Sequence, residues 1–248
     1  MLQQQYKIDK YGKEILLQDN KHQVMMEWEK PYMEACIDAI EPEGDVLEIG
    51  FGLGYSATHI LNYKPKSYTI IECEPIVIKR IKQWAKKYPH TPIYIIEGRW
   101  QDTLHKLGKF DSIFFDDFPL EINEKSNKIE YVLSVQRYLV FIDQCIQYHT
   151  RINAKISMYS NNQTNNIGLS CDIMPFIQTE NRDIEVFIPN NCKYREIGLH
   201  KCSIIIIKKV KEFDIETSTN FVNKVKKQVN FNNDEISKKL ETMLINKN

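Results

Sequence analysis

The chain has 248 residues, of which 42% are hydrophobic, enough to build one substantial core. Basic and acidic residues number 33 each, so the net charge is zero and no overall field favours nucleic acid or an anionic membrane. No apolar stretch approaches the roughly 20 residues that span a bilayer, and the start lacks the apolar core of a signal peptide. Six cysteines at irregular spacings indicate reduced thiols and no metal site. We therefore expect a soluble, cytoplasmic protein.

The chain begins with a polar, mixed segment over residues 1–23, which we interpret as a cover on the domain. Helical spacing follows over residues 24–41 and ends before a Pro-Glu-Gly turn. From residue 211 to 248 the sequence predicts a C-terminal helical extension, and a surface helix packed on its own domain is the simplest interpretation. The apolar residues with helical spacing in this extension are Ile236, Leu240, Met243 and Leu244.

Between these ends, short apolar runs alternate with helical patterns, which predicts βαβ units and a mostly parallel sheet. The strand candidates are 45–50, 68–72, 92–97, 110–116, 154–160, 184–188 and 202–207, and the helical patterns are 54–63, 75–88 and 128–149. No helix-length insert separates the last two strands, so we expect them to be antiparallel. The predicted fold class is α/β, a Rossmann-like seven-stranded sheet over residues 24–210 with an antiparallel C-terminal hairpin.

A glycine-rich turn is the most informative motif. The first predicted strand leads into Gly50-Phe51-Gly52-Leu53-Gly54, and Glu72 ends the second strand about 20 residues later, where an acid can bind ribose hydroxyls. Tyr55 occupies the position of the third glycine in a dinucleotide fingerprint, which weakens an NAD interpretation. The pattern favours S-adenosylmethionine (SAM), which has no phosphate to cradle. The alternative is a turn that only connects a strand to a helix.

Ligands of such sheets bind beyond the carboxyl ends of the strands, which directs attention to two further segments. Trp100 follows the third strand candidate, where an indole could flank an adenine, although a core or surface aromatic is an equal alternative. Asp116 and Asp117 follow the fourth, where an acid can also serve as a strand-end cap.

Several segments together resemble a known family, over roughly residues 15–210. They are Val-Met-Met-Glu-Trp-Glu-Lys-Pro-Tyr-Met at 24–33, Glu-Ile-Gly-Phe-Gly at 48–52, Ile-Glu-Cys at 71–73, Gly-Arg-Trp-Gln-Asp at 98–102, Phe-Asp-Asp-Phe-Pro-Leu at 115–120 and Asn-Cys-Lys-Tyr at 191–194. The chain resembles the guanidinoacetate methyltransferases and their relatives, the fungal and plant protein arginine δ-N-methyltransferases. The segment 24–33 is much more specific than the glycine turn.

The resemblance implies a SAM-dependent enzyme that methylates a guanidino nitrogen, in guanidinoacetate or in a protein arginine. It implies that Glu29 and Asp116 hold the guanidinium and that Met25 lies beside the substrate. The residues that match positions lining the SAM site are Met33, Gly50, Phe51, Gly52, Leu53, Gly54, Tyr55, Glu72, Cys73, Arg99 and Trp100.

The chemistry of a guanidinium explains the two acids. Its pKa exceeds 12 and its nitrogens lack a free lone pair, so it attacks a methyl group only when charge is drawn off it. Carboxylates meet its planar fork in paired hydrogen bonds, and one of them can take the departing proton. We expect Asp116 to be the base and Glu29 the orienting anchor, although residue type and spacing alone favour a solvated helix position for Glu29.

One departure from the family bears on the substrate. Asp117 stands where the creatine-forming enzymes usually carry threonine, and a third carboxylate facing the pocket would suit a more cationic substrate. Two other functions fit the sequence less well. A nucleic-acid amino methyltransferase would normally show an Asn/Asp-Pro-Pro-Tyr motif, which is absent at 116–119, and a non-catalytic SAM-binding scaffold would have no need of both acids. A monomer and a homodimer remain open.

Overall fold

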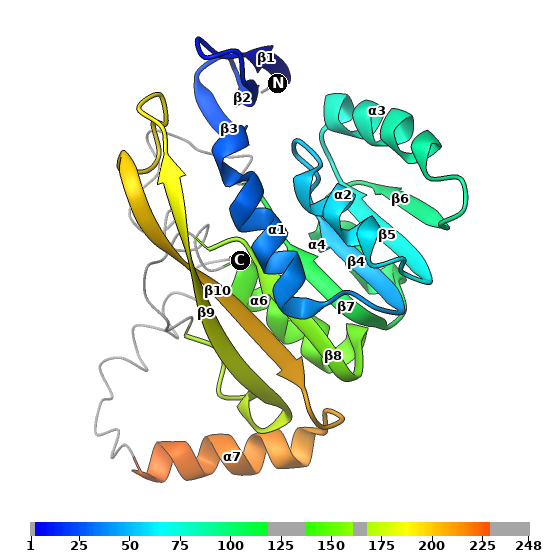
Figure 1. Cartoon of the computed structure of the whole chain (residues 1–248). Coiled ribbons are helices and arrows are strands. Elements are labelled where there is room, and N and C mark those ends of the chain that lie inside the picture. Colours follow the sequence, from blue (N-terminus) through cyan, green and yellow to red (C-terminus); the bar gives the residue numbers. More distant parts are fainter. Residues whose placement is uncertain (1–2, 119–136, 161–167, 229–248) are drawn as a thin grey trace, which may run out of the picture.

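The computed structural model describes residues 3–118, 137–160 and 168–228 and contains a seven-stranded sheet. Its strands are β4 (Asp45–Ile49), β5 (Ser67–Glu72), β6 (Ile93–Glu97), β7 (Phe110–Phe115), β8 (Thr150–Met158), β9 (Ile177–Ile188) and β10 (Gly198–Lys209). The spatial order is β6-β5-β4-β7-β8-β10-β9, with β4 to β8 parallel and β10 antiparallel to both of its neighbours (Figure 1). The predicted parallel sheet with an antiparallel C-terminal hairpin is confirmed.

Helices cover both faces of the sheet (Figure 1). One face carries α1 (Lys30–Ile40), α2 (Tyr55–Asn62) and α3 (Pro75–Trp84), and the other carries α4 (Trp100–Thr103) and α6 (Arg137–Gln144). Shorter turns are the 3-10 segments Glu27–Glu29, Ala85–Lys87, Leu104–Lys106 and Met174–Phe176 and the π-helical Cys145–His149. The predicted helices 54–63 and 75–88 are thus confirmed within a few residues.

Two apolar cores lie on the two faces of the sheet, because successive side chains of a strand point to opposite sides. Val46 and Phe114 join the core beneath α1 and α2, whereas their chain neighbours Leu47 and Phe115 join the core beneath α4 and α6. This double burial holds the carboxyl ends of β4, β5 and β7 in fixed positions, and the candidate site is built there.

The N-terminal segment is more ordered in structure than its polar composition predicts. It forms an antiparallel sheet of β1 (Gln4–Ile8), β2 (Glu14–Gln18) and β3 (His22–Met26). The predicted boundary at residue 23 therefore falls inside β3. The prediction of a helix from residue 24 was wrong, because β3 pairs with β2 and the helix begins at Lys30, with Pro31 in its first turn.

The remaining predictions concern the middle and the end of the chain. Of the predicted helix 128–149, α6 and the π-helical turn are observed, and residues 128–136 lie outside the described residues. α7 (Ile215–Gln228) begins the C-terminal extension, whereas Ile236, Leu240, Met243 and Leu244 lie outside the described part. All six cysteines are free, as expected. No helix of the described residues is long and apolar enough to cross a membrane.

Candidate active site

The glycine turn after β4 packs closely against the end of β7. Gly50 has a φ of 80°, and a Cβ there would collide with the main-chain oxygen of Asp116. Gly52 has a φ of 52°, and its Cβ would lie 2.5 Å from Met25 Sδ, which also accepts a hydrogen bond from the Leu53 N–H at 3.1 Å. Only glycine fits these two positions, which brings the cofactor turn, Asp116 and Met25 together.

The apolar residues of the predicted cofactor set pack inside the protein. Met33 on α1, Phe51 and Leu53 are buried, and the Phe51 ring meets Trp84 of α3 edge-on with centroids 5.3 Å apart. Tyr55, the first residue of α2, is half-buried, and Gly54 precedes it with a φ of 79°. These contacts fix the position of the turn relative to α1 and α3.

Glu72 at the end of β5 is buried and accepts three main-chain hydrogen bonds. Its Oε2 accepts from the Phe51 N–H at 3.1 Å, and its Oε1 accepts from Cys73 at 2.7 Å and from Glu74 at 3.0 Å. Burial raises the pKa of this carboxyl. A carboxylate oxygen accepts about two hydrogen bonds, so Oε2 has capacity for one more donor, such as a ribose hydroxyl.

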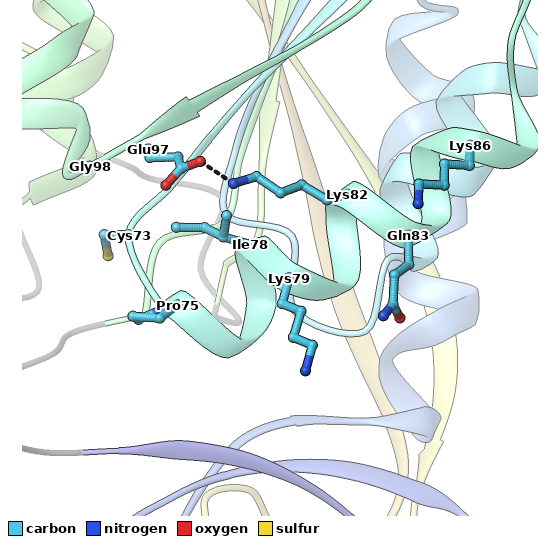
Figure 2. Close-up of a pocket in the computed structure, with 9 residues that line it drawn as sticks. All are labelled: Cys73, Pro75, Ile78, Lys79, Lys82, Gln83, Lys86, Glu97 and Gly98. Carbon is cyan, nitrogen blue, oxygen red and sulfur yellow. Dashed lines mark ion pairs between the residues drawn. The ribbon is translucent and has the colours of Figure 1, made fainter.

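An open cleft of about 600 Å³ reaches the predicted cofactor residues from the side of α3 (Figure 2). Cys73 and Gly98 form one end of it, and the Lys82–Glu97 ion pair, 2.5 Å long, lies across it. Cys73 is half-buried, and burial raises the pKa of its thiol to about 12, so the thiol stays neutral at pH 7. Arg99, next to Gly98, precedes α4.

Trp100 lies at the start of α4 and is 4% exposed, with its ring edge-on to Phe141 at 5.3 Å. Its Nε1–H donates to Asp117 Oδ2 at 2.9 Å. Arg137 at the start of α6 brings its Nε within 3.6 Å of the same oxygen and donates from Nη2 to the Asp117 main-chain oxygen at 3.2 Å. The Asp117 carboxylate is therefore paired with an arginine and hydrogen-bonded to an indole.

Glu29, the predicted anchor, ends the 3-10 turn before α1 and is 3% exposed. Its Oε1 accepts hydrogen bonds from the Met26 N–H at 2.8 Å and from the Tyr194 hydroxyl at 2.5 Å. Burial raises the pKa of Glu29 from 4.5 to about 7. The solvated helix position that residue spacing favours is therefore wrong. Tyr194, from the β9–β10 connection, was a motif residue in the sequence, and its contact with Glu29 was not foreseen.

Asp116 follows β7 and faces other acids. The pKa of its carboxyl is raised well above the ordinary value by burial and, next in size, by the charge of Glu29, followed by those of Glu48 and Asp117. Among the described residues no side chain or main-chain group donates a hydrogen bond to this carboxylate. The structure therefore places the two predicted acids within electrostatic reach of each other.

Glu48 is a third buried acid, which sequence reasoning noted only as the residue before the glycine turn. It lies in β4, is completely buried and accepts hydrogen bonds from the hydroxyls of Ser56 and Tyr68. Burial raises its pKa from 4.5 to about 8. Tyr68 and Ser56 carry no motif, and the apolar run around Tyr68 gave no signal of this role.

Two buried acids, Glu29 and Glu48, and the half-buried Asp116 form no ion pair with a lysine or arginine of the described residues, which is an unusual environment. Burying an unpaired carboxylate is costly, so such groups either stay protonated or bind a cation. The arrangement can therefore hold a planar cation against a strand-end turn suited to a nucleoside cofactor.

Comparisons with known proteins agree with this geometry. The family model described as guanidinoacetate N-methyltransferase matches residues 9–209. Protein arginine N-methyltransferase 2 of Candida glabrata is 40% identical over 115 residues, which are 43% of this chain and 27% of that protein. The protein of the same name from Saccharomyces cerevisiae is 37% identical over 117 residues, 42% of this chain and 28% of that protein. The match thus spans about a quarter of the length of these curated relatives.

Solved structures give the same fold at low sequence identity. Spermidine synthase from Thermotoga maritima superposes with a TM-score of 0.54 and 15% identity, covering 93% of this chain and 85% of that chain. TrmN from Thermus thermophilus gives 0.53 and 9%, covering 84% and 60%. The fold is that of the class I methyltransferases, and the cofactor of this family is SAM. On the family match over residues 9–209, the chain belongs to the guanidinoacetate N-methyltransferase family of SAM-dependent methyltransferases.

Proposed function

We propose that the enzyme transfers a methyl group from SAM to a guanidino nitrogen of a small, guanidinoacetate-like substrate. The observation that carries the proposal is the pair of acids, Glu29 and Asp116, beside the Gly50 turn. Burial raises the pKa of both carboxyls, and the charge of Glu29 raises that of Asp116 further. A bound guanidinium supplies the missing positive charge, so it returns both acids to their ionised form.

Glu29 is the proposed anchor for the substrate. The Met26 N–H and the Tyr194 hydroxyl donate to Oε1 and fix the orientation of the carboxylate. Its carboxylate is the proposed acceptor for the guanidinium, whose planar fork matches a carboxylate. Because the anchor is held before substrate binds, the attacking nitrogen loses little orientational freedom afterwards.

Asp116 is the proposed base. The chemistry that SAM supplies when bound is a methyl group on a positively charged sulfur, which departs as a neutral sulfide and needs no acid. As the nitrogen–carbon bond forms and the carbon–sulfur bond breaks, the nitrogen must lose a proton. The Asp116 carboxylate, which has no competing donor among the described residues, accepts that proton.

The residues proposed to hold the cofactor surround the carboxyl ends of β4, β5 and β6. They are Met33, Gly50, Phe51, Gly52, Leu53, Gly54, Tyr55, Glu72, Cys73, Arg99 and Trp100, with Met25 beside the substrate. Two features support the fit: the unused capacity of Glu72 Oε2 for a hydroxyl donor, and a turn with three positive-φ glycines directly after β4. We also propose a cytoplasmic location, with which six free thiols are compatible.

A protein arginine is the second candidate substrate, because the curated relatives carry the name protein arginine N-methyltransferase 2. The same two acids would hold either guanidinium. A non-catalytic SAM-binding scaffold is a further candidate function, but it does not explain why two acids without an ion pair in the described chain are kept at the site.

Mass spectrometry of S-adenosylhomocysteine and methylated product tests the proposal. The full chain is incubated with SAM and guanidinoacetate, free arginine or an arginine peptide. We expect product with guanidinoacetate, and loss of it in Asp116→Asn and Glu29→Gln but not in Glu34→Gln, a more exposed glutamate of α1. Product from the peptide alone would replace the small substrate by protein arginine. SAM binding without turnover of any guanidino compound would contradict an enzyme of this class.

A further inference from the structure

Two main-chain oxygens of the glycine turn, residues 50–54, accept hydrogen bonds from other parts of the chain. The Tyr6 hydroxyl of β1 donates to the Gly52 oxygen at 2.8 Å, and Nη2 of Arg80 on α3 donates to the Leu53 oxygen at 3.4 Å. Main-chain groups of a turn lack the regular partners of a helix or strand, so side chains often satisfy them. The N-terminal sheet and α3 therefore hold the turn from outside.

Arg80 joins α3 to β1 and β2. Its Nη1 and Nη2 donate to the two carboxylate oxygens of Glu14 at 2.6 and 2.8 Å, a paired geometry that fixes both side chains. Its guanidinium lies over the Tyr6 ring, 4.4 Å from the centroid. The Arg80 and Glu14 side chains are 31% and 35% exposed, so water screens this pair less than a pair on the open surface. One arginine thus holds Tyr6, Glu14 and the glycine turn in one cluster.

The register of the N-terminal sheet places Tyr6 and Glu14 on one face. Tyr6 lies opposite Leu16, and Glu14 is two residues before Leu16 in β2. Residues two apart in a strand share a face, and Leu16 is 1% exposed, so this face packs on the domain. Burial raises the pKa of the Tyr6 hydroxyl well above its ordinary value, which keeps the hydroxyl protonated and able to donate to Gly52.

The third strand of the N-terminal sheet contacts the turn as well. Met25 of β3 accepts a hydrogen bond from the Leu53 N–H through its sulfur and lies against Gly52. β1 and β3 therefore meet the same short turn, one at a main-chain oxygen and the other at a main-chain N–H. If the sheet moved away, the turn would lose these contacts together.

We propose that Tyr6 and Arg80 are positioning residues for the cofactor, because they hold the glycine turn in the conformation that receives SAM, and that Glu14 fixes Arg80 in this role. The inference rests on the proposed function of residues 50–54 in cofactor binding. It makes cofactor affinity depend on docking of the N-terminal sheet. Coupling of this kind is reciprocal, so bound cofactor must stabilise the docked sheet by the same factor.

Calorimetric titration of the full chain with S-adenosylhomocysteine tests the inference. We expect Arg80→Gln to weaken binding about 5- to 150-fold, the usual range of coupling between two sites. Tyr6→Phe removes one hydroxyl and should weaken binding about 2- to 10-fold, the range of a single hydrogen bond. With saturating SAM, the KM for guanidinoacetate should stay close to that of the wild type in both variants, whereas the KM for SAM should rise.

Three variants make the result specific. Lys13→Gln removes the 2.7 Å ion pair with Glu27, which also belongs to the N-terminal segment but lies outside the glycine turn, and it should leave the affinity unchanged. Arg80→Lys keeps the charge and loses the planar fork, so it should retain only part of the affinity. Tyr6→Phe keeps the ring, and it keeps the inference testable if Arg80→Gln does not fold.

Hydrogen exchange of the main-chain amides of β1 and β2 gives a second readout. S-adenosylhomocysteine should slow this exchange in the wild type, and slow it less in Arg80→Gln and Tyr6→Phe. A purely structural role of the two residues would instead speed exchange in the variants without changing the effect of the ligand.

The outcomes separate this inference from the proposed function. Wild-type affinity for S-adenosylhomocysteine in both variants, an equal loss of affinity in Lys13→Gln, or exchange in β1 and β2 that the ligand does not change would overturn the positioning role while leaving guanidino methylation intact. Failure of the wild type to bind S-adenosylhomocysteine would instead contradict the proposed cofactor site itself.

Discussion

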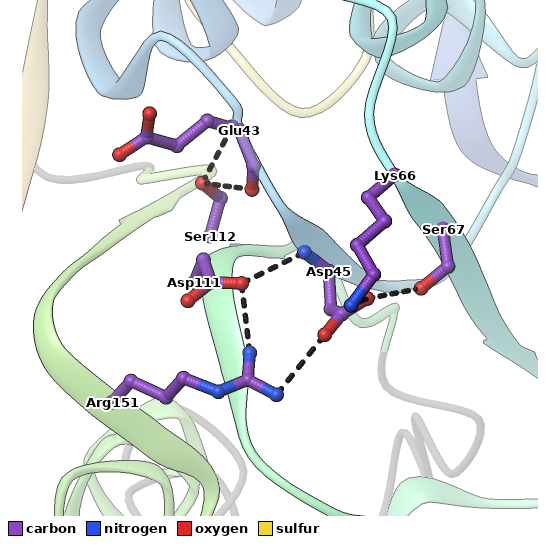
Figure 3. A network of polar contacts seen from close by, with 7 residues as sticks. All are labelled: Glu43, Asp45, Lys66, Ser67, Asp111, Ser112 and Arg151. Atoms are coloured by element: carbon purple, nitrogen blue, oxygen red, sulfur yellow. Dashed lines mark hydrogen bonds and ion pairs between the residues drawn. The ribbon is translucent and has the colours of Figure 1, made fainter.

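The acidic residues at the two edges of the parallel sheet differ in their partners: those at one edge form ion pairs, whereas three at the other form none with the described residues. At the amino edge, where β4, β5, β7 and β8 begin, the Arg151 guanidinium donates to Asp111 at 2.7 Å and to Asp45 at 3.0 Å (Figure 3). Ser67 donates its hydroxyl to Asp45 at 2.8 Å, and Lys66 lies 3.9 Å away. The Ser67 hydrogen bond and these cations lower the pKa of Asp45.

At the carboxyl edge, Glu29 and Glu48 are buried and Asp116 is half-buried, none of them forms an ion pair with a lysine or arginine of the described residues, and each has a raised pKa. One edge is neutralised by the protein itself, and the other is left to be neutralised by a ligand. The difference indicates that the acids of the carboxyl edge serve binding and chemistry at a cost in stability, whereas those of the amino edge serve the fold.

Asp116→Asn should have the largest effect of the variants considered, and the effect should be on catalysis. Removal of the proposed base is expected to lower kcat about 100- to 10,000-fold, the usual contribution of general base catalysis. Thermal unfolding should show an unchanged or higher midpoint, because a buried carboxyl next to other acids is replaced by a neutral amide. The matched change at the other edge, Asp111→Asn, should lower the midpoint and leave kcat unchanged. A catalytically normal Asp116→Asn enzyme would rule out the assigned role.

Glu29→Gln is expected to act mainly on substrate affinity. The amide keeps the shape of the side chain and loses the charge, which removes a charge-assisted contact and should raise KM about 10- to 100-fold. Initial-rate kinetics over a range of guanidinoacetate concentrations measure this. An unchanged KM with reduced kcat would instead identify Glu29 as the base.

The pH dependence of stability should carry the signature of the carboxyl edge. The folded-state pKa values of Glu29 and Glu48, about 7 and about 8, exceed the ordinary value of 4.5. Between pH 4.5 and these values the folded protein therefore binds more protons than the unfolded chain. Their contribution is complete below pH 4.5 and is lost as the pH rises through 7 to 8, by about 1.4 kcal/mol per pH unit for each group within the window. Urea unfolding from pH 5 to 8 measures the slope.

Two variants serve as controls for the slope of stability against pH. Glu29→Gln should flatten the decline below pH 7, and Glu48→Gln should flatten it up to pH 8. A wild-type stability that rises steadily from pH 5 to 8 would show that neither acid is protonated in the folded state.

Arg151→Ala should have the smallest effect. The side chain is 44% exposed, so its two ion pairs are screened by water and are expected to contribute only about 0.5–1 kcal/mol together. Chemical unfolding at low and high salt should show a small loss that fades with added salt. Kinetic constants should not change, and a fall in kcat would mean that the two edges are coupled.

The central sheet could be predicted from sequence because β4 to β7 are short apolar runs separated by helical patterns. The N-terminal sheet could not, because its strands are mostly polar and only a few side chains, such as Leu16 and Met25, are buried. Pairing of β2 with β3, rather than local spacing, decided the structure of residues 24–26.

The residues of the candidate site could be predicted only where they belong to a sequence motif. Residue type and spacing favoured a solvated Glu29, and the resemblance over residues 24–33 pointed to the site. Its burial depends on Tyr194, 165 residues away, which no local pattern reveals. The pairing of Asp117 with Arg137 was not foreseen either, because Arg137 lies 20 residues further along the chain. Long-range pairing of charged side chains is thus the part that sequence reasoning misses.

The most direct test of the central claim is the number of protons released when guanidinoacetate binds. Calorimetry at pH 6.5, in buffers of different ionisation enthalpy and with S-adenosylhomocysteine present, gives that number. If a guanidinium neutralises the buried acids, wild-type protein should release about one proton or more per substrate bound, and Asp116→Asn and Glu29→Gln should each release fewer. Binding without proton release would show that the acids are already ionised, and would contradict the account.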